Sequence, residues 1–243
     1  MRSPKNPAPT PASSWSVRGR LVGAAAIAFA VLVVMENVLF AVTDAPSYGD
    51  PLEEVLSYYA TNPDTVAIIS GLVALYLPLL LLFVTGLHGV VERRGGAGAG
   101  WSRLALAAGA TLSAIFVLFN VTQIGLALSA GGLDEPTPAF ELVWQIHAAA
   151  FGLAMPMIGT TCIGVTLAAH ASELTPAWLR LLGLVSGSLL LAAGFGNFAI
   201  ADGSPLIFVG LLGFAAWLAW LVATGVRLVR STELRPDTPE GRS

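Results

Sequence analysis

The chain contains six long, mainly apolar stretches, each bounded by polar or turn-forming residues. A helix needs about 20 apolar residues to cross the hydrocarbon core of a bilayer, and backbone groups inside lipid must be hydrogen-bonded within the segment. The pattern therefore predicts an all-α polytopic membrane protein built as a six-transmembrane-helix bundle. The expected spans cover residues 21–42, 66–90, 104–129, 142–169, 179–201 and 205–228.

Composition excludes a soluble domain. Charged residues make up 11 % of the 243 residues, whereas a soluble protein carries about 25 %. The single cysteine, Cys162, excludes an intrachain disulfide and a cysteine metal cluster. The basic residues form no patch with interleaved aromatics, so we expect no nucleic-acid partner. No metal site, cofactor or catalytic motif is predicted.

Basic and acidic residues fall in alternate connections between the expected spans. All 12 Lys and Arg residues lie before the first span, between the second and third, at the start of the fifth, or from the end of the last span onward. The excess of Lys and Arg in cytoplasmic loops then predicts that both termini are cytoplasmic. Arg outnumbers Lys eleven to one, which is typical of a GC-rich bacterial genome. We therefore expect a multi-pass protein of a bacterial plasma membrane.

Two further segments have a sequence character of their own. Residues 1–20 and 229–243 are expected to be disordered cytoplasmic tails. Between the first two spans, Asp50-Pro51 is typical of a helix start, and apolar residues follow at helical spacing. We expect a short amphipathic helix on the periplasmic side, lying flat on the membrane surface. Its apolar positions are Leu52, Val55, Leu56 and Tyr59.

Glu36 is the one acidic residue well inside a predicted span. An ionisable group at that depth is costly, so such residues usually face the bundle interior and mark a site. The alternative is a protonated carboxyl that bonds a neighbouring helix and contributes only to stability. The sequence leaves both interpretations open.

Other polar residues favour the same half of the bilayer. Asn120 and Gln123 are three residues apart and share a helix face, and Asn197 shares a face with a stripe of glycines. Together they predict a small polar pocket that opens outward. The alternative is that each amide merely joins two helices. The candidate ligand-binding residues are Glu36, Asn120, Gln123, Gln145, His147 and Asn197.

Two of the expected helical hairpins, formed by spans two and three and by spans four and five, share a sequence pattern. Trp101 and Trp178 open the third and fifth spans, and an Asn stands nineteen residues after each. Parallel repeats of this kind occur in several transporter folds. Convergence is the alternative, because Trp favours membrane interfaces in any case.

Two segments carry a resemblance. The stretches SELTPAWLRLLG (172–183) and YYATNP (58–63) resemble a family of uncharacterised actinobacterial integral membrane proteins with six spans. The resemblance implies the six-span topology and a bacterial source. It implies no activity and no functional residues.

Three functional classes follow from these observations. The favoured one is a non-enzymatic protein that binds a lipid, a small amphiphile or another membrane protein, because no catalytic spacing is present. The second is a small-molecule or proton-linked transporter in which Glu36 titrates. The third is an intramembrane enzyme that uses Glu36 and His147 as an acid–base pair, which requires the two within hydrogen-bond reach. A homo-oligomer is compatible with all three.

Overall fold

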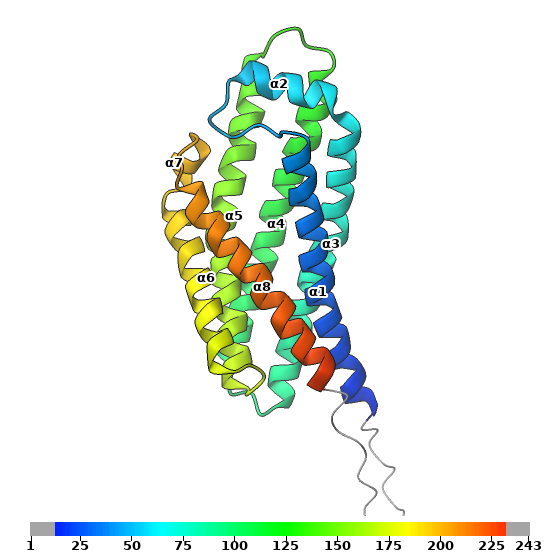
Figure 1. Ribbon diagram of the computed structural model, residues 1–243, viewed down its shortest axis with the longest axis vertical. Helices are drawn as coiled ribbons and strands as arrows, with labels where there is room; N and C mark the ends of the chain where they lie inside the picture. Colours follow the sequence, from blue (N-terminus) through cyan, green and yellow to red (C-terminus); the bar gives the residue numbers. More distant parts are fainter. Residues whose placement is uncertain (1–12, 232–243) are drawn as a thin grey trace, which may run out of the picture.

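The computed structural model describes residues 13–231, and the side chains of residues 18–230. These residues form helices joined by short loops, and no strand occurs among them (Figure 1). The fold is therefore all-α, as the apolar stretches predict. The helices are α1 (Ser13–Val42), α2 (Leu52–Thr61), α3 (Pro63–Arg93), α4 (Ala99–Ala130), α5 (Pro138–Ala171), α6 (Ala177–Phe195), α7 (Asn197–Ala201) and α8 (Ile207–Ser231).

Six of the helices in the described part are long and apolar enough to cross a membrane: α1, α3, α4, α5, α6 and α8. Each packs on the next around a closed ring, in the order α1, α3, α4, α5, α6, α8 and back to α1. The chain ends of α1 and α8 lie at the same end of the bundle (Figure 1). The predicted six-span bundle is confirmed, and its ring arrangement encloses a common interior.

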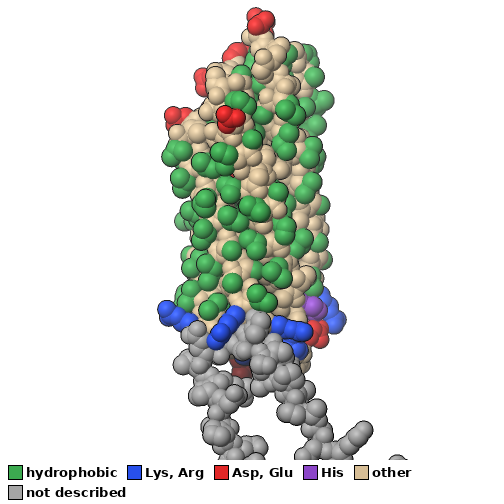
Figure 2. All heavy atoms as spheres, turned by 90° about the vertical axis from the view of Figure 1, so that its right-hand side faces the viewer, with side chains coloured by type: hydrophobic (Ala, Val, Ile, Leu, Met, Phe, Trp, Pro, Cys, Tyr) green, Lys and Arg blue, Asp and Glu red, His purple; other side chains and the backbone are tan. Residues whose placement is uncertain are grey.

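Charged side chains separate to the two ends of the bundle, and hydrophobic side chains cover the middle of the face in Figure 2. We call the end that carries α2 the acidic end and the opposite end the basic end. The acidic end carries Asp44, Asp50, Glu53, Glu54, Asp64, Asp134, Glu135, Glu141 and Asp202. Among the described residues, the basic end carries Arg18, Arg20, Arg93, Arg94, Arg103, Arg180, Arg227 and Arg230.

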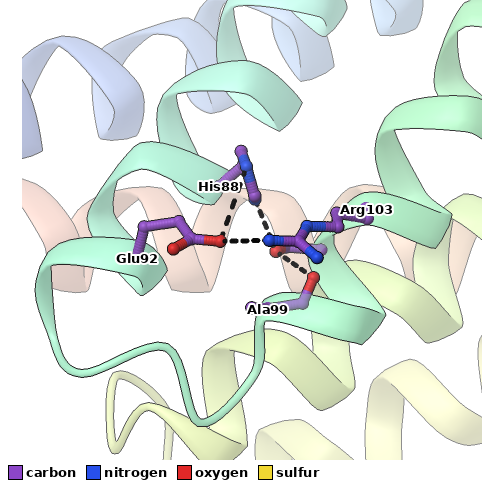
Figure 3. Close-up of polar contacts among 5 residues, drawn as sticks. His88, Glu92, Ala99 and Arg103 are labelled. Carbon is purple, nitrogen blue, oxygen red and sulfur yellow. Dashed lines mark hydrogen bonds and ion pairs between the residues drawn. The ribbon is translucent and has the colours of Figure 1, made fainter.

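A polar cluster joins α3 to α4 at the basic end (Figure 3). Arg103 donates to the Glu92 carboxylate over 3.2 Å. The His88 Nδ1 atom lies 2.8 Å from the hydroxyl of Ser102, which in turn donates to the carbonyl of Ala99 over 3.0 Å. These bonds close the glycine-rich turn between the two helices on a charged, partly exposed surface.

Helix α2 runs across the acidic end of the bundle (Figure 1), and its role differs from the expected one. Its apolar face does not face lipid, because Val55 and Tyr59 are buried in a cluster with Leu126 of α4 and Trp144 of α5. The helix is therefore a cap on the bundle. Asp50 also differs, since its carboxylate accepts from the backbone of Ser47 over 2.6 Å and leaves α2 without a side-chain cap.

Several helix boundaries depart from the predicted ones. The fifth span ends at Phe195, and Gly196 separates it from the short α7, which was predicted as its continuation. Helix α1 begins at Ser13, inside the segment expected to be a disordered tail, and α8 continues to Ser231. The rest of both predicted tails, residues 1–12 and 232–243, lies outside the described residues.

Helices α1 and α8 approach closely near the basic end. A Cβ atom on Gly225 would lie 2.7 Å from the carbonyl oxygen of Gly23, and one on Gly23 would lie 2.5 Å from that of Gly225. Small residues permit this backbone contact, which is how helices in lipid gain van der Waals energy. Toward the acidic end the two helices are linked by larger side chains, such as the rings of Phe29 and Trp217, 5.4 Å apart.

Replacing Gly225 by alanine is expected to force α1 and α8 apart, because the new methyl group would lie 2.7 Å from the carbonyl oxygen of Gly23 and 2.8 Å from the side chain of Ile27. We expect the free energy of unfolding to fall by about 1–3 kcal/mol, measured by thermal unfolding in mild detergent. Gly71→Ala is the matched control, since nothing lies within 4 Å of its added Cβ. Equal melting temperatures for the two variants would contradict the proposed contact.

Candidate functional site

The ring of helices encloses a cavity of about 390 Å³ in the half of the bundle nearest the acidic end. Its wall comes from all eight described helices, and the loops at residues 45–48 and 203–204 line it at the acidic end. Cavities of about 300–1,000 Å³ hold drug-sized ligands in known proteins. The volume therefore suits a small organic molecule or a short lipid-like chain.

Aromatic rings dominate the cavity wall, and they touch one another in one continuous series. Ring contacts run from α8 through α1, α3 and α4 to α5, with centroids between 3.9 and 6.4 Å apart. Edge-to-face and offset pairs at these distances stabilise their own arrangement. The series comprises Phe214, Trp217, Phe29, Tyr76, Phe116, Phe119, His147, Phe151, Tyr48, Trp144, Tyr59 and Tyr58.

Glu36 lies in the wall of this cavity, and its side chain is 5 % exposed. The Tyr76 hydroxyl of α3 donates to its Oε1 atom over 3.4 Å, a long hydrogen bond. The Tyr76 ring is itself held edge-on by Phe29 and Phe116, at centroid distances of 5.6 and 6.3 Å. Among the residues that the structure describes, no Lys or Arg lines the cavity. The one carboxyl group of the wall therefore has a phenol as neighbour and no cation.

His147 of α5 also lines the cavity, and its imidazole is fixed on both faces and at one nitrogen. The ring stacks on Phe119 at 3.9 Å and on Trp144 at 5.4 Å. Its Nδ1 atom lies 3.2 Å from the carbonyl oxygen of Phe119 and 3.1 Å from the hydroxyl of Thr122. Because a carbonyl only accepts, we assign a hydrogen to Nδ1.

Glu36 and His147 thus belong to one cavity, but no hydrogen bond joins them in the described structure: each bonds to other partners. A direct acid–base pair therefore has no geometric support here. What the cavity brings together is one carboxyl, one imidazole and an aromatic surface.

The other four candidate residues do not line this cavity. Gln145 is exposed and donates to Glu141 on its own helix over 3.0 Å. Asn197 begins α7 and packs on α5, where a Cβ on Gly152 would lie 3.0 Å from its carbonyl. Gln123 is fully buried and Asn120 partly so, each with side-chain amide atoms that have no hydrogen-bond partner.

The cavity wall reaches the outer surface of the bundle between α1 and α8. These helices converge at the basic end and separate toward the acidic end (Figure 1). In the separated part, Asn37 of α1 lines the cavity and is exposed, as are Phe208 (67 %) and Leu211 (38 %) of α8. Since these helices are predicted spans, the opening faces the region that lipid would occupy.

Toward the basic end the cavity is closed by bulky side chains. Trp217 forms part of the wall, and Trp220 follows one helical turn deeper, 6.4 Å from the ring of Phe83. All three are at most 1 % exposed. The described structure is therefore open only in its acidic half.

Two loops line the cavity at the acidic end and meet at glycines. Gly203 has a φ angle of +85°, and a Cβ there would lie 2.5 Å from the Cα atom of Gly49. Next to this contact, the Tyr48 ring packs against Trp144 and Phe151. Burial raises the pKa of the Tyr48 phenol well above its usual value, so this loop presents a neutral hydroxyl.

The aromatic wall was not predicted. Phe29, Val33 and Phe40 stand seven and three residues before and four residues after Glu36, so the face of α1 that carries the carboxyl can be found from spacing alone. Aromatic residues on the other helices have no such signal, because rings at helical spacing also face lipid or fill cores.

No family model matches the chain, and neither the curated proteins nor the solved structures contain a match. The resemblance to actinobacterial six-span proteins therefore stays a prediction.

Tyr76→Phe is expected to lower the free energy of unfolding by about 1 kcal/mol or less, because it removes one long hydrogen bond and keeps the ring. Tyr76→Ala also removes the ring contacts with Phe29 and Phe116, and should cost about 3–5 kcal/mol. Thermal unfolding of both variants in the same detergent compares them. Equal losses would show that the hydroxyl, and not the ring, holds this part of the wall.

Proposed function

We propose that this membrane protein binds a small amphiphile in the aromatic cavity, and that the ligand enters from the lipid through the opening between α1 and α8. The observation that carries the proposal is a largely apolar cavity whose wall continues onto the lipid-facing side of two spans. An amphiphile suits such a site, because its apolar body can stay in an apolar medium throughout entry. Glu36 and His147 supply polar contacts at the wall.

The cap formed by α2 supports entry from the side. Val55, Tyr59 and Trp144 pack together above the cavity, and the loops carrying Gly49 and Gly203 are in contact. A ligand that arrived from water would have to displace this cluster. The surface between α1 and α8 carries single side chains, Phe208 among them, that can change rotamer.

A proton-linked transporter that uses Glu36 is the alternative, since the carboxyl lies in a cavity that reaches one side of the bundle. Transport would require a second state in which Trp217 and Trp220 leave the closed half. The described conformation supports binding directly and transport only through such a change.

We further propose a bacterial plasma membrane as the location, with both termini in the cytoplasm. Separation of Arg residues to the basic end, which also holds the chain ends of α1 and α8, supports this orientation (Figure 2). The amphiphile would then enter from the outer leaflet.

Ala154 lines the cavity from α5, and the next residue back, Leu153, is 48 % exposed and does not line it. Ala154→Phe is expected to fill the cavity and weaken amphiphile binding at least tenfold, while Leu153→Phe places the same ring outside it and changes binding less than about twofold. Isothermal titration of protein in lipid nanodiscs measures both. The probes are decyltrimethylammonium, decyldimethylphosphine oxide and decylsulfonate, with the heat of empty nanodiscs subtracted.

Saturable binding of at least one probe to the wild type, lost in Ala154→Phe, is the expected result. The melting temperature of each variant shows whether it remains folded. If none of the three probes binds saturably, or if both variants bind like the wild type, the cavity is not an amphiphile site.

Orientation can be measured by cysteine labelling, because Cys162 is fully buried and gives little background. Ala60 of α2 and Ala97 in the turn before α4 are both exposed and lie at opposite ends of the bundle. In intact cells, a membrane-impermeant maleimide should label Ala60→Cys and not Ala97→Cys, and both after lysis. The reverse pattern would show that the basic end faces outward.

A further inference from the structure

Among the described residues, the cavity wall has one carboxyl side chain, that of Glu36, and no Lys or Arg. The other described side chains of the wall, the His147 imidazole among them, are aromatic, aliphatic or small and polar. A buried carboxyl group in a protein is either paired with a cation or neutral, because removing an ion from water costs several kcal/mol. A wall with one carboxyl and no Lys or Arg therefore leaves the place of a cationic partner open to a ligand.

No neighbouring Lys or Arg in the described structure pairs with the Glu36 carboxyl. Its hydrogen bond from Tyr76 spans 3.4 Å and involves a neutral phenol. The side-chain amide of Asn37, the next residue of α1, donates to the carbonyl oxygen of Val33 over 2.8 Å. The His147 imidazole has its Nδ1 hydrogen directed to Phe119. The carboxyl group thus remains available to a ligand.

The rings near Glu36 favour a cation over other partners. The Tyr76 hydroxyl donates to the Glu36 carboxyl. The rings of Phe29 and Phe116 pack edge-to-face with the Tyr76 ring, at centroid distances of 5.6 and 6.3 Å. Aromatic faces carry negative electrostatic potential and attract ammonium groups, which is the basis of aromatic cages for quaternary amines. The carboxyl group and the aromatic rings therefore both favour a positively charged ligand.

The charge at the acidic end of the bundle has the same sign as an ionised Glu36. The described residues of this end include no Lys or Arg, while Asp44 and Asp202 lie in the two loops that line the cavity there. Clefts surrounded by one sign of charge concentrate ligands of the opposite sign. An anionic head group would meet repulsion at the acidic end and again at Glu36.

Resting on the proposed function, we infer that the amphiphile is a cation: a lipophilic primary or quaternary amine whose ammonium group pairs with Glu36. Glu36 lies six residues from the end of α1, about 9 Å below it at 1.5 Å per residue. The ammonium group then sits between the carboxyl and the rings of Tyr76 and Phe29. The apolar body extends toward Ile158 and Leu190, where the wall carries no charge.

The test compares the three decyl probes, which share a chain and differ in head-group charge. Decyltrimethylammonium should bind wild-type protein in nanodiscs at least tenfold more tightly than the neutral phosphine oxide, and decylsulfonate should bind weakest. Glu36→Gln should remove the preference, weakening the cation at least tenfold and changing the neutral probe less than about twofold. Glu141→Gln is the matched control, because it removes a carboxylate at the same end of the bundle outside the cavity.

The outcomes separate this inference from the function on which it rests. If the neutral probe binds saturably and as tightly as the cation, or if Glu36→Gln leaves cation binding unchanged, the cavity takes amphiphiles but not cations selectively. If Glu141→Gln weakens the cation as much as Glu36→Gln, the preference comes from the general field. If no probe binds saturably, the proposed function itself fails. The wild-type comparison needs no variant, so the inference stays testable even if Glu36→Gln does not fold.

Discussion

The distance between α1 and α8 determines the rest of the structure, and side-chain size sets that distance. Near the basic end Gly23 and Gly225 let the two backbones touch. Toward the acidic end the same helices are separated by rings such as Phe29 and Trp217. In lipid no hydrophobic force closes a gap between helices, so packing alone decides where they meet. Glycines let the two helices touch at the basic end, and aromatic residues keep them apart toward the acidic end. The bundle is therefore closed in its basic half and contains the cavity in its acidic half.

This view explains why the cavity coexists with a stable bundle. The rings of the wall support one another in a continuous series, so the space between them does not depend on a ligand to keep it open. Helix α2 adds a lid by burying Val55 and Tyr59 against α4 and α5. Rigid walls and a lid leave one flank, between α1 and α8, where only single side chains stand between the cavity and its surroundings.

The sequence predicts the spans and the separation of charge well, because both follow from the cost of placing polar groups in hydrocarbon. For the same reason it points to Glu36 and His147, which share the cavity. Asn120 and Gln123 lie outside this cavity, since amides three residues apart share a helix face but the sequence does not reveal which neighbour that face meets. The sequence also does not show that the apolar face of α2 packs on the bundle, because an apolar stripe has the same pattern whether it covers a bundle or rests on lipid.

The flank between α1 and α8 has a consequence for how tightly any ligand can appear to bind. A site that samples the leaflet responds to the concentration there, and partition into the bilayer gains about 0.8 kcal/mol for each buried methylene. Every added methylene then raises apparent affinity measured against aqueous ligand by about fourfold, even where the extra carbon never touches the protein. Glu36 and the aromatic rings near it then need only distinguish among ligands that have already partitioned into the bilayer.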